Sequence, residues 1–325
     1  MARVARIEEH GGPEVIKWVD VDLPDPGAGE VQIRSTAVGL NFIEIYQRTG
    51  LYPLKLPSGL GGESVGVVEA IGPGVTSLAP GDRVGTFGPA IGSYATHRNL
   101  PAEQLIKLPD DVDDNTAAAI LLKGGTTEFL VERCARVQPG WTVLVHAAAG
   151  GVGHLAVGWL KAIGATVIGT VGSADKADRA TRAGADHVIQ YREQDIVETV
   201  RALTGGKGVD VSLDGVGAAT WDASLKSVRP RGMIVSYGNA SGPVTGVALG
   251  QLAAHGSLFV TRPTMFSYYA NGEERAAGFA RVFEMLRKGA IKPEIGQTFA
   301  LEDAAEAHRQ LEAGKTEGAS ILIPG

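Results

Sequence analysis

A short turn rich in glycine and alanine, residues 147–153, stands between an apolar run and an apolar helical stretch. Its sequence is Ala147-Ala148-Ala149-Gly150-Gly151-Val152-Gly153. Small residues let the backbone turn sharply and approach a pyrophosphate, and a following helix N-terminus supplies amide donors and a positive dipole. Tight strand–helix packing alone can also require such a turn. A β-rich run at 142–146, a helix expected over 154–163 and a second strand at 166–171 favour dinucleotide binding.

The end of the second strand distinguishes NAD from NADP. An enzyme that uses NAD usually carries Asp or Glu there for the ribose 2′-hydroxyl. This strand ends in Val171-Gly172-Ser173, and Lys176 follows within the first helical turn. A hydroxyl and a lysine suit a 2′-phosphate, which a carboxylate would repel. Asp175 lies beyond the strand end, where it can point to solvent, so the sequence predicts NADPH; the alternative is that Lys176 is only a solvated helix residue.

Tyr191-Arg192, after the third strand, offers an aromatic face for adenine and a second cation. The competing interpretation is an ordinary pair of surface loop residues.

The elements that position these residues follow a regular rhythm from about residue 126 onward. Helical stretches of ten or more residues alternate with short apolar strands, and this alternation predicts a doubly wound parallel sheet. The expected strands are 142–146, 166–171, 186–189, 209–214 and 232–236.

Residues 1–125 follow a different pattern. Short alternating or β-branched runs such as 30–34 and 66–71 are separated by turn signals at 25–27, 72–74 and 80–82. Many short strands with close turns suggest a barrel-like, β-rich domain.

The last segment predicts helices over 273–287 and 301–313 and a strand at 320–323 that rejoins the first domain. We therefore expect an α/β protein of two domains, 1–125 with 263–325 and an inserted 126–262.

Composition narrows the class of protein. The 325-residue chain has a formal net charge of −6, which argues against nucleic-acid or anionic-membrane partners. Cys134 is the one cysteine, so neither an intrachain disulfide nor a cysteine-rich zinc site is possible. The N-terminus lacks an apolar signal core, and no run approaches the roughly 18 to 20 apolar residues of a membrane helix. A cytoplasmic protein is expected.

Several motifs resemble the medium-chain dehydrogenase/reductase superfamily. They are Gly61-Gly62-Glu63-Ser64-Val65-Gly66-Val67-Val68, Val75 and Gly81-Asp82-Arg83-Val84-Gly85. The zinc alcohol dehydrogenases of that superfamily carry a histidine ligand where this chain has Gly62, and a cysteine ligand near Asn41. Neither residue here suits zinc, so we expect no metal and no Lewis-acid mechanism.

The closer resemblance is to the quinone oxidoreductase, or zeta-crystallin-like, branch, and it covers essentially the whole chain. Its motifs are 10–15, 41–43 with Tyr46, 50–53, 123–127, 146–153, 236–242 and 260–263. The resemblance implies a GroES-like domain with an inserted Rossmann sheet, reduction of quinones by NADPH, and a homodimer.

The same resemblance implies roles for individual residues. Asn41, Tyr46 and Thr126 would lie near the nicotinamide half of NADPH. Gly150, Gly151 and Val152 would hold the pyrophosphate, and Ser173, Lys176 and Tyr191 would surround the 2′-phosphate. Gly217, Gly238 and Asn239 would line the cofactor through backbone contacts, and Tyr52 would lie in the substrate cleft. Residues 125–129 lack the bulkier side chains common in the branch, which leaves the pocket's shape open.

The expected chemistry needs little from the protein. A quinone accepts hydride readily once its ring is held against the nicotinamide and water is excluded. Tyr46 or Tyr52 can hydrogen-bond its carbonyl oxygen, although each can instead be a packing or gate residue. Asn41, the third catalytic candidate, can instead be a structural cap.

Two other functions stay open at this point. One is NADPH-dependent reduction of the C=C bond of enals or enones, which uses the same cofactor logic. The other is an NADPH-binding protein without important catalysis, acting structurally or on RNA.

Overall fold

The computed structural model describes residues 1–88 and 90–325, which divide into two compact units. The β-rich unit contains Met1–Leu122, Asn271–Phe279 and Pro293–Gly325, and the parallel-sheet unit contains Lys123–Ala270 and Ala280–Lys292. The domains expected from the sequence divide instead after residues 125 and 262, and they assign 280–292 to the first domain. Residues 280–292 contact the parallel-sheet unit: Arg281 forms a 2.8 Å ion pair with Glu132, and the carbonyl of Lys292 lies 3.1 Å from Nε2 of His154.

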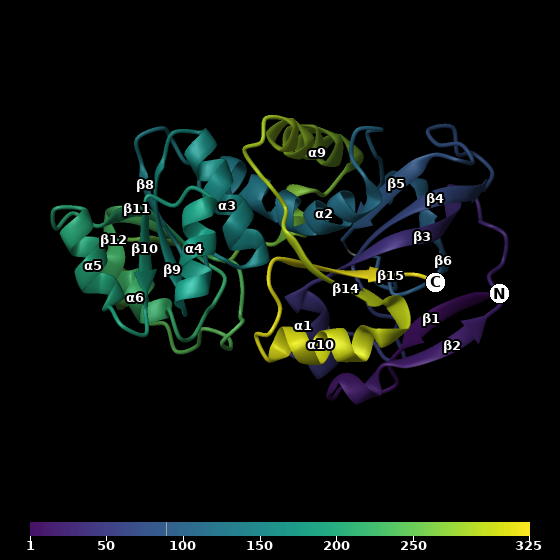
Figure 1. The fold of residues 1–325 in the computed structure, drawn as a ribbon, viewed down its shortest axis with the longest axis horizontal. Coiled ribbons are helices and arrows are strands. Elements are labelled where there is room, and N and C mark those ends of the chain that lie inside the picture. The colour runs from purple at the N-terminus through teal and green to yellow at the C-terminus, as the bar shows by residue number, and fades with distance from the viewer. Residues whose placement is uncertain (89) are drawn as a thin grey trace. The chain divides into compact units, whose positions relative to one another are not determined.

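Six parallel strands form the sheet of the parallel-sheet unit, in the order β10-β9-β8-β11-β12-β13 (Figure 1). They are β8 (Thr142–Val145), β9 (Thr166–Val171), β10 (His187–Gln190), β11 (Val209–Asp214), β12 (Val228–Ser236) and β13 (Phe259–Thr261). The chain starts at the centre of the sheet and winds first to one edge and then to the other. This doubly wound order confirms the predicted Rossmann-type sheet, with a switch point between β8 and β11.

Helices connect these strands and cover the sheet. They are α3 (Gly151–Ala162), α4 (Ala174–Arg182), α5 (Ile196–Leu203), α6 (Trp221–Ser227) and α7 (Leu249–Ala254). Leu144, Ile168 and Ile234 of the sheet are buried in one cluster with Val200 of α5 and Leu225 of α6. Each such side chain contributes roughly 1.5–3 kcal/mol on burial. The strands therefore form a stable base for the loops at their carboxyl ends.

The β-rich unit contains a seven-stranded sheet with the path β14-β15-β3-β4-β5-β7, and β6 pairs with β3. Its strands are β3 (Glu30–Leu40), β4 (Glu63–Ile71), β5 (Arg83–Phe87), β6 (His97–Pro101), β7 (Leu105–Lys107), β14 (Ile295–Ala300) and β15 (Ala319–Ile323). A separate antiparallel pair is formed by β1 (Ala2–Arg6) and β2 (Lys17–Val21). The many short strands confirm the β-rich prediction, but among the described residues they form an open sheet rather than a closed barrel.

The remaining helices are α1 (Phe42–Thr49), α2 (Asp114–Glu128), α8 (Met265–Tyr268), α9 (Gly272–Arg287) and α10 (Ala304–Glu312). A π-helical segment, Phe129–Cys134, continues α2, and a short 3₁₀ turn precedes α10. The two predicted C-terminal helices correspond to α9 and α10. The predicted last strand lies within β15, which pairs with β3 and returns the chain to the β-rich unit (Figure 1).

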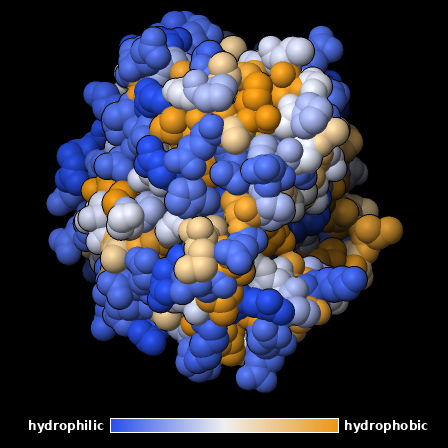
Figure 2. All heavy atoms as spheres, turned by 90° about the vertical axis from the view of Figure 1, so that its right-hand side faces the viewer, coloured by the Kyte–Doolittle hydropathy of each residue, from blue (hydrophilic) through white to orange (hydrophobic). Residues whose placement is uncertain are grey.

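The balance of hydrophilic and hydrophobic residues on the surface is ordinary for this chain. The face drawn in Figure 2 is mostly hydrophilic, with hydrophobic residues in scattered groups. Across the described residues, no helix combines the length and the apolar character needed to cross a membrane.

Candidate active site

The glycine turn after β8 has a strained and closely packed backbone. Ala147 adopts a positive φ of 51°, and the N–H of Gly150 donates to the carbonyl of Ala147 at 2.8 Å. A Cβ atom on Gly153 would lie 2.2 Å from that carbonyl oxygen, so only glycine fits there. Helix α3 begins at Gly151, three residues before the predicted start. Gly151 and Val152 therefore present N-terminal helix amides, which have no partner within the helix.

The position of this turn matches its predicted role. It follows the central strand β8 and lies beside β11, where the strand order reverses. Nucleotides bind open parallel sheets outside the carboxyl ends of the strands at such a switch point. The geometry therefore suits a pyrophosphate at the N-terminus of α3.

The second cluster lies at the ends of β9 and β10. Ser173 is the N-cap residue of α4, but its side chain makes no capping hydrogen bond, and Lys176 is exposed in the first turn of that helix. Tyr191 follows β10, and its N–H donates to the carbonyl of Val171 at 3.1 Å. A Cβ on Gly172 would lie only 2.6 Å from the Tyr191 hydroxyl oxygen. The fold thus brings Ser173 and Tyr191, predicted to share one phosphate, to neighbouring loops.

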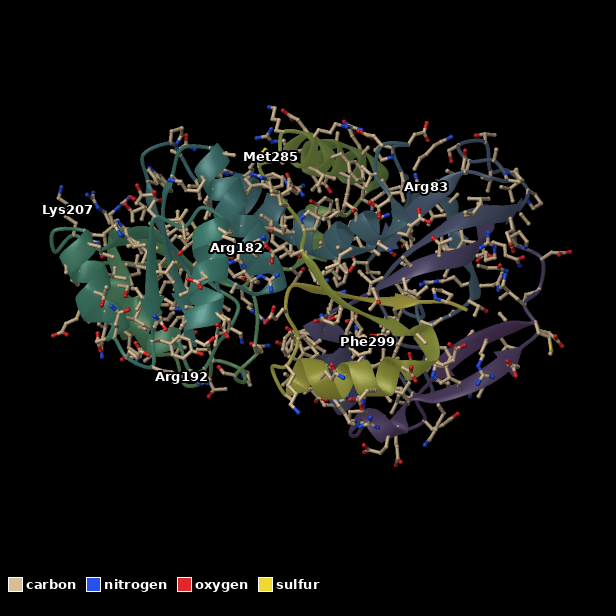
Figure 3. All side chains as sticks on the ribbon, in the orientation of Figure 1. Arg83, Arg182, Arg192, Lys207, Met285 and Phe299 are labelled. Carbon is tan, nitrogen blue, oxygen red and sulfur yellow. The ribbon has the colours of Figure 1, made fainter. Side chains whose placement is uncertain are left out.

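Arg192 follows Tyr191 at the end of the sheet where the strands finish, and its side chain is exposed (Figure 3). Its place is consistent with the second cation expected from the sequence.

The third cluster joins the loops after β11 and β12. Gly217 has a φ of 94°, and a Cβ on Gly238 would lie 2.1 Å from the carbonyl oxygen of Gly215, so the two loops are in close contact. The N–H of Ser241 donates to the carbonyl of Val216 at 2.8 Å. Gly217, Gly238 and Asn239 are therefore brought together at the carboxyl edge of the sheet, as the cofactor prediction requires.

Two anchors of these loops were not identified from the sequence. Arg262, just after β13, donates to the carbonyls of Ser236 at 2.8 Å and Gly238 at 3.3 Å. Asp214 is buried and accepts the backbone N–H groups of Val216 and Gly217 at 2.9 and 3.0 Å. The signal for Asp214 is a carboxylate at the end of an otherwise apolar strand.

His146 has a structural place at the end of β8. It is fully buried, with Nδ1 3.0 Å from the Thr170 hydroxyl and Nε2 3.1 Å from the Ser224 hydroxyl. Burial lowers the pKa of His146, and the nearby Asp214 carboxylate only partly opposes this effect. The imidazole therefore links the end of β8 to β9 and to α6 through its two ring nitrogens.

Thr126 lies on α2, in the parallel-sheet unit, and is half-buried. The neighbouring carbonyl of Gly125 accepts a 3.0 Å hydrogen bond from the Tyr269 hydroxyl, which also donates to Glu128 at 2.6 Å. This end of α2 is thereby fixed in place.

The predicted acceptor-side residues belong to the β-rich unit. Tyr46 and Tyr52 are half-buried, with ring centroids 5.1 Å apart, and the N–H of Tyr52 donates to the carbonyl of Tyr46 at 2.9 Å. The exposed ring of Phe42 lies 6.2 Å from Tyr46. The two predicted tyrosines therefore form one aromatic cluster, to which Phe42 adds a third ring that the sequence analysis did not include.

Asn41 is the buried N-cap residue of α1, which agrees with the structural alternative for this residue. Its amide Nδ2 also donates a 2.9 Å hydrogen bond to Oε2 of Glu63, a carboxylate with no exposed surface. A second buried carboxylate, Glu44, accepts the N–H of Asn41 at 2.6 Å and that of Gly62 at 3.2 Å. Neither glutamate was predicted from the sequence to have a role, although a glutamate at the start of the apolar run 63–68 was a visible signal.

Within residues 1–88 and 90–325, no cluster of three or more His, Cys, Asp or Glu side chains is arranged to hold a metal ion.

Two family models match the chain. Residues 27–110 match the alcohol dehydrogenase GroES-like domain, and residues 151–283 match the zinc-binding dehydrogenase family. This pair of domains defines the class, so the chain is a medium-chain dehydrogenase/reductase.

Three relatives narrow the class to a branch. A quinone oxidoreductase of Pseudomonas aeruginosa is 47% identical over 325 residues, all of both chains. The Escherichia coli quinone oxidoreductase solved with NADPH is 45% identical, with a TM-score of 0.97 over all of both chains. A 2-haloacrylate reductase of a Burkholderia species is 43% identical over all of this chain and 99% of its own. The chain belongs to the quinone oxidoreductase branch of the superfamily, which confirms the resemblance seen in the sequence.

Proposed function

We propose that this protein is an NADPH-dependent quinone reductase that works without zinc. The observation that carries the proposal is the end of β9, where no carboxylate stands at the strand tip and Ser173 and Lys176 follow at the start of α4. The quinone oxidoreductases of the same branch, among them the E. coli protein solved with NADPH, support both the cofactor and the reaction.

The residues of the parallel-sheet unit fit NADPH. The amides of Gly151 and Val152 at the start of α3 would bind the pyrophosphate, and Ser173, Lys176 and Tyr191 the 2′-phosphate. Gly217, Gly238, Asn239 and Thr126 complete the proposed set. When bound, NADPH supplies the hydride.

The acceptor would be held by the aromatic cluster of the β-rich unit. Tyr46 and Tyr52 present flat, half-buried rings of the kind that stack on a quinone. A tyrosine hydroxyl hydrogen-bonds the carbonyl oxygen as negative charge develops. Asn41 is the third proposed catalytic residue, besides Tyr46 and Tyr52. It would supply a polar group near the nicotinamide half of NADPH.

Zinc independence follows from the same unit. Asn41 and Gly62 offer no zinc ligand of the usual kind, and the buried carboxylate of Glu44 already accepts an N–H from each of them. Exhaustive dialysis against a chelator should leave turnover unchanged. Loss of activity that zinc restores would remove this part of the proposal.

We further propose a cytoplasmic homodimer with no nucleic-acid or membrane partner. Strand β13 is the last strand in the path of the parallel sheet, and its Phe259 and Val260 are 60% and 38% exposed. An apolar strand at a sheet edge pairs readily with another strand. Sedimentation of the wild type and of Phe259→Lys tests this: a dimer is expected for the first and a monomer for the second.

A substrate panel tests the function itself. Purified protein should oxidise NADPH with 1,4-benzoquinone and 1,2-naphthoquinone, and much more slowly with an enone of similar size. The enone is included in the panel because one of the relatives is a 2-haloacrylate reductase. Faster turnover of the enone than of the quinones would support C=C reduction in place of quinone reduction. NADPH binding without turnover of any substrate would support an NADPH-binding protein without important catalysis.

A further inference from the structure

Three polar residues form one row at the carboxyl end of the parallel sheet. The pairing of β8 with β9 and with β11 ends at Val145. One residue further along the three chain segments come His146, Thr170 and Asp214, and all three are buried. Residues in one row of a parallel sheet project to the same face. These side chains therefore share one face at the level where the strands lead into loops.

Each of the three residues adjoins one loop of the candidate site. His146 directly precedes the glycine turn 147–153, and Thr170 lies three residues before Ser173. Asp214 accepts two backbone N–H groups of the loop after β11. A connection among these three side chains would therefore connect the three loops.

Ser224 of α6 supplies that connection from a fully buried position. Its hydroxyl donates to Oδ2 of Asp214 at 2.8 Å, and the same oxygen lies 3.1 Å from Nε2 of His146. A hydroxyl has one proton, and a carboxylate only accepts. Because Ser224 gives its proton to Asp214, the Nε2 atom of His146 must be the donor to Ser224.

The proton on Nε2 determines the other end of the imidazole. Burial lowers the pKa of His146, and a neutral imidazole carries a proton on only one ring nitrogen. Nδ1 is then an acceptor, and the hydroxyl of Thr170, 3.0 Å away, donates to it. The donors thus run in one direction, from Thr170 through His146 and Ser224 to the carboxylate of Asp214.

We propose that Asp214 is a positioning residue for the NADPH site, because its hydrogen bond with Ser224 fixes the Nε2–H tautomer of His146. That tautomer orients the hydroxyl of Thr170, so the glycine turn, the end of β9 and the loop after β11 are held in one arrangement around the adenosine and pyrophosphate half of the cofactor. These loops bind NADPH in the proposed function, on which the inference rests.

Ser224→Ala cuts the connection in the middle. Asp214 keeps its bonds to Val216, Gly217 and Thr220, so the loop after β11 retains its own anchor. A lost hydrogen bond to a charged group lowers the fraction of protein in the binding arrangement, and we expect the Kd for NADPH to rise roughly 10-fold. The Kd for 2′-phospho-ADP-ribose, which lacks the nicotinamide, should rise by the same factor.

Ser227→Ala is the matched control. Ser227 is buried on the same helix α6, and its hydroxyl oxygen has no hydrogen-bond partner within residues 1–88 and 90–325. The substitution removes the same atom from the same helix without cutting the connection. The Kd of this variant for NADPH should equal that of the wild type.

Thr170→Val cuts the far end of the connection with little change of shape. It removes the donor to Nδ1 of His146, and loss of this neutral hydrogen bond should raise the Kd for NADPH about 5-fold. Because both cuts open one connection, the double variant should bind NADPH no more than about 2-fold more weakly than Ser224→Ala alone. Independent structural roles would instead multiply the two effects.

The tautomer of His146 gives a readout that a packing role of Ser224 would not change. ¹⁵N-histidine labelling reports all seven histidines, and the His146 signals are those absent from His146→Gln. The wild type should show the proton on Nε2. In Ser224→Ala this nitrogen loses its acceptor, whereas the Thr170 oxygen can accept from Nδ1, so the proton should move to Nδ1. Ser227→Ala should leave it on Nε2.

Weaker NADPH binding by Ser224→Ala than by Ser227→Ala, together with the change of tautomer, supports the inference. Equal Kd values for these two variants overturn it, as do effects that multiply in the double variant. If the variants unfold, the wild-type spectrum decides: a proton on Nε2 supports the inference, and a proton on Nδ1 overturns it. None of these measurements needs a quinone, so wild-type protein that binds NADPH without quinone turnover would refute the proposed reaction, while the binding and tautomer results would still decide the role of Asp214.

Discussion

The hydroxyl of Tyr191 lies directly against Gly172, since a Cβ atom on that glycine would be 2.6 Å from the tyrosine oxygen. The contact joins the loop after β10 to the end of β9, one residue before Ser173. A side chain at position 172 and a tyrosine at 191 thus compete for one space. The proposed 2′-phosphate site depends on this contact as well as on charge.

Gly172→Ala should weaken NADPH binding by pushing Tyr191 aside. The φ of Gly172 lies outside the left-handed region, so alanine adds bulk without backbone strain. We expect the Kd for NADPH to rise several-fold, measured by calorimetry. Tyr191→Phe in the same protein removes the clashing oxygen and should recover part of the loss. An alanine variant with wild-type affinity would show that the contact is not used.

Lys176→Ala should weaken NADPH much more than NADH. A charge-assisted bond to phosphate is worth roughly 10- to 100-fold in affinity, and NADH has no 2′-phosphate. Lys207→Ala is the control, because that exposed lysine precedes β11 at the opposite end of the sheet (Figure 3). Equal effects of Lys176→Ala on the two cofactors would remove the 2′-phosphate role.

Tyr52→Phe should change kcat with benzoquinone less than about 5-fold, because a quinone needs no dedicated acid. Tyr52→Ala removes the ring that packs 5.1 Å from Tyr46, so it should raise KM for the quinone with a smaller effect on KM for NADPH. Steady-state kinetics separate the two effects. A loss of kcat in Tyr52→Phe beyond about 100-fold would instead make this hydroxyl a proton donor.

His308 should make stability depend on pH. It is fully buried, and burial together with the charge of Arg48 lowers its pKa to about 3 from the ordinary 6.5. Below pH 6.5 the unfolded chain binds a proton that the folded protein does not, so the free energy of unfolding falls as pH drops from 6.5 toward 3. The slope from this group is at most about 1.4 kcal/mol per pH unit.

Urea unfolding of the wild type and of His308→Gln between pH 4 and 7 measures that contribution. The variant loses the contacts of the imidazole with Arg48 at 3.2 Å and Tyr94 at 2.9 Å, so it should be less stable at pH 7. Its slope with pH should nevertheless be shallower. Parallel slopes would mean that His308 does not stay neutral in the folded protein.

The features that could be predicted from the sequence are those that the local pattern of residues determines. The apolar runs at 142–146 and 166–171 became the neighbouring strands β8 and β9, since short β-branched segments between helices form a parallel sheet. The start of α3 was placed three residues late, because Gly151 and Val152 look like turn residues until the helix that follows is seen.

Other features depend on contacts between distant residues. Glu63 meets Asn41 across 22 positions, and Tyr191 meets Gly172 only because β9 and β10 are paired. No local spacing indicates either contact. The open sheet of the β-rich unit was missed for the same reason, since closure of a barrel depends on strand pairing over the whole sheet.

The most direct test compares kcat/KM for NADPH and NADH in the wild type, with 1,2-naphthoquinone as acceptor. We expect oxidation that requires the quinone, and a preference for NADPH of roughly 10-fold or more from the 2′-phosphate contacts. Oxidation that is independent of the quinone, or equal use of NADH, would contradict NADPH-dependent quinone reduction.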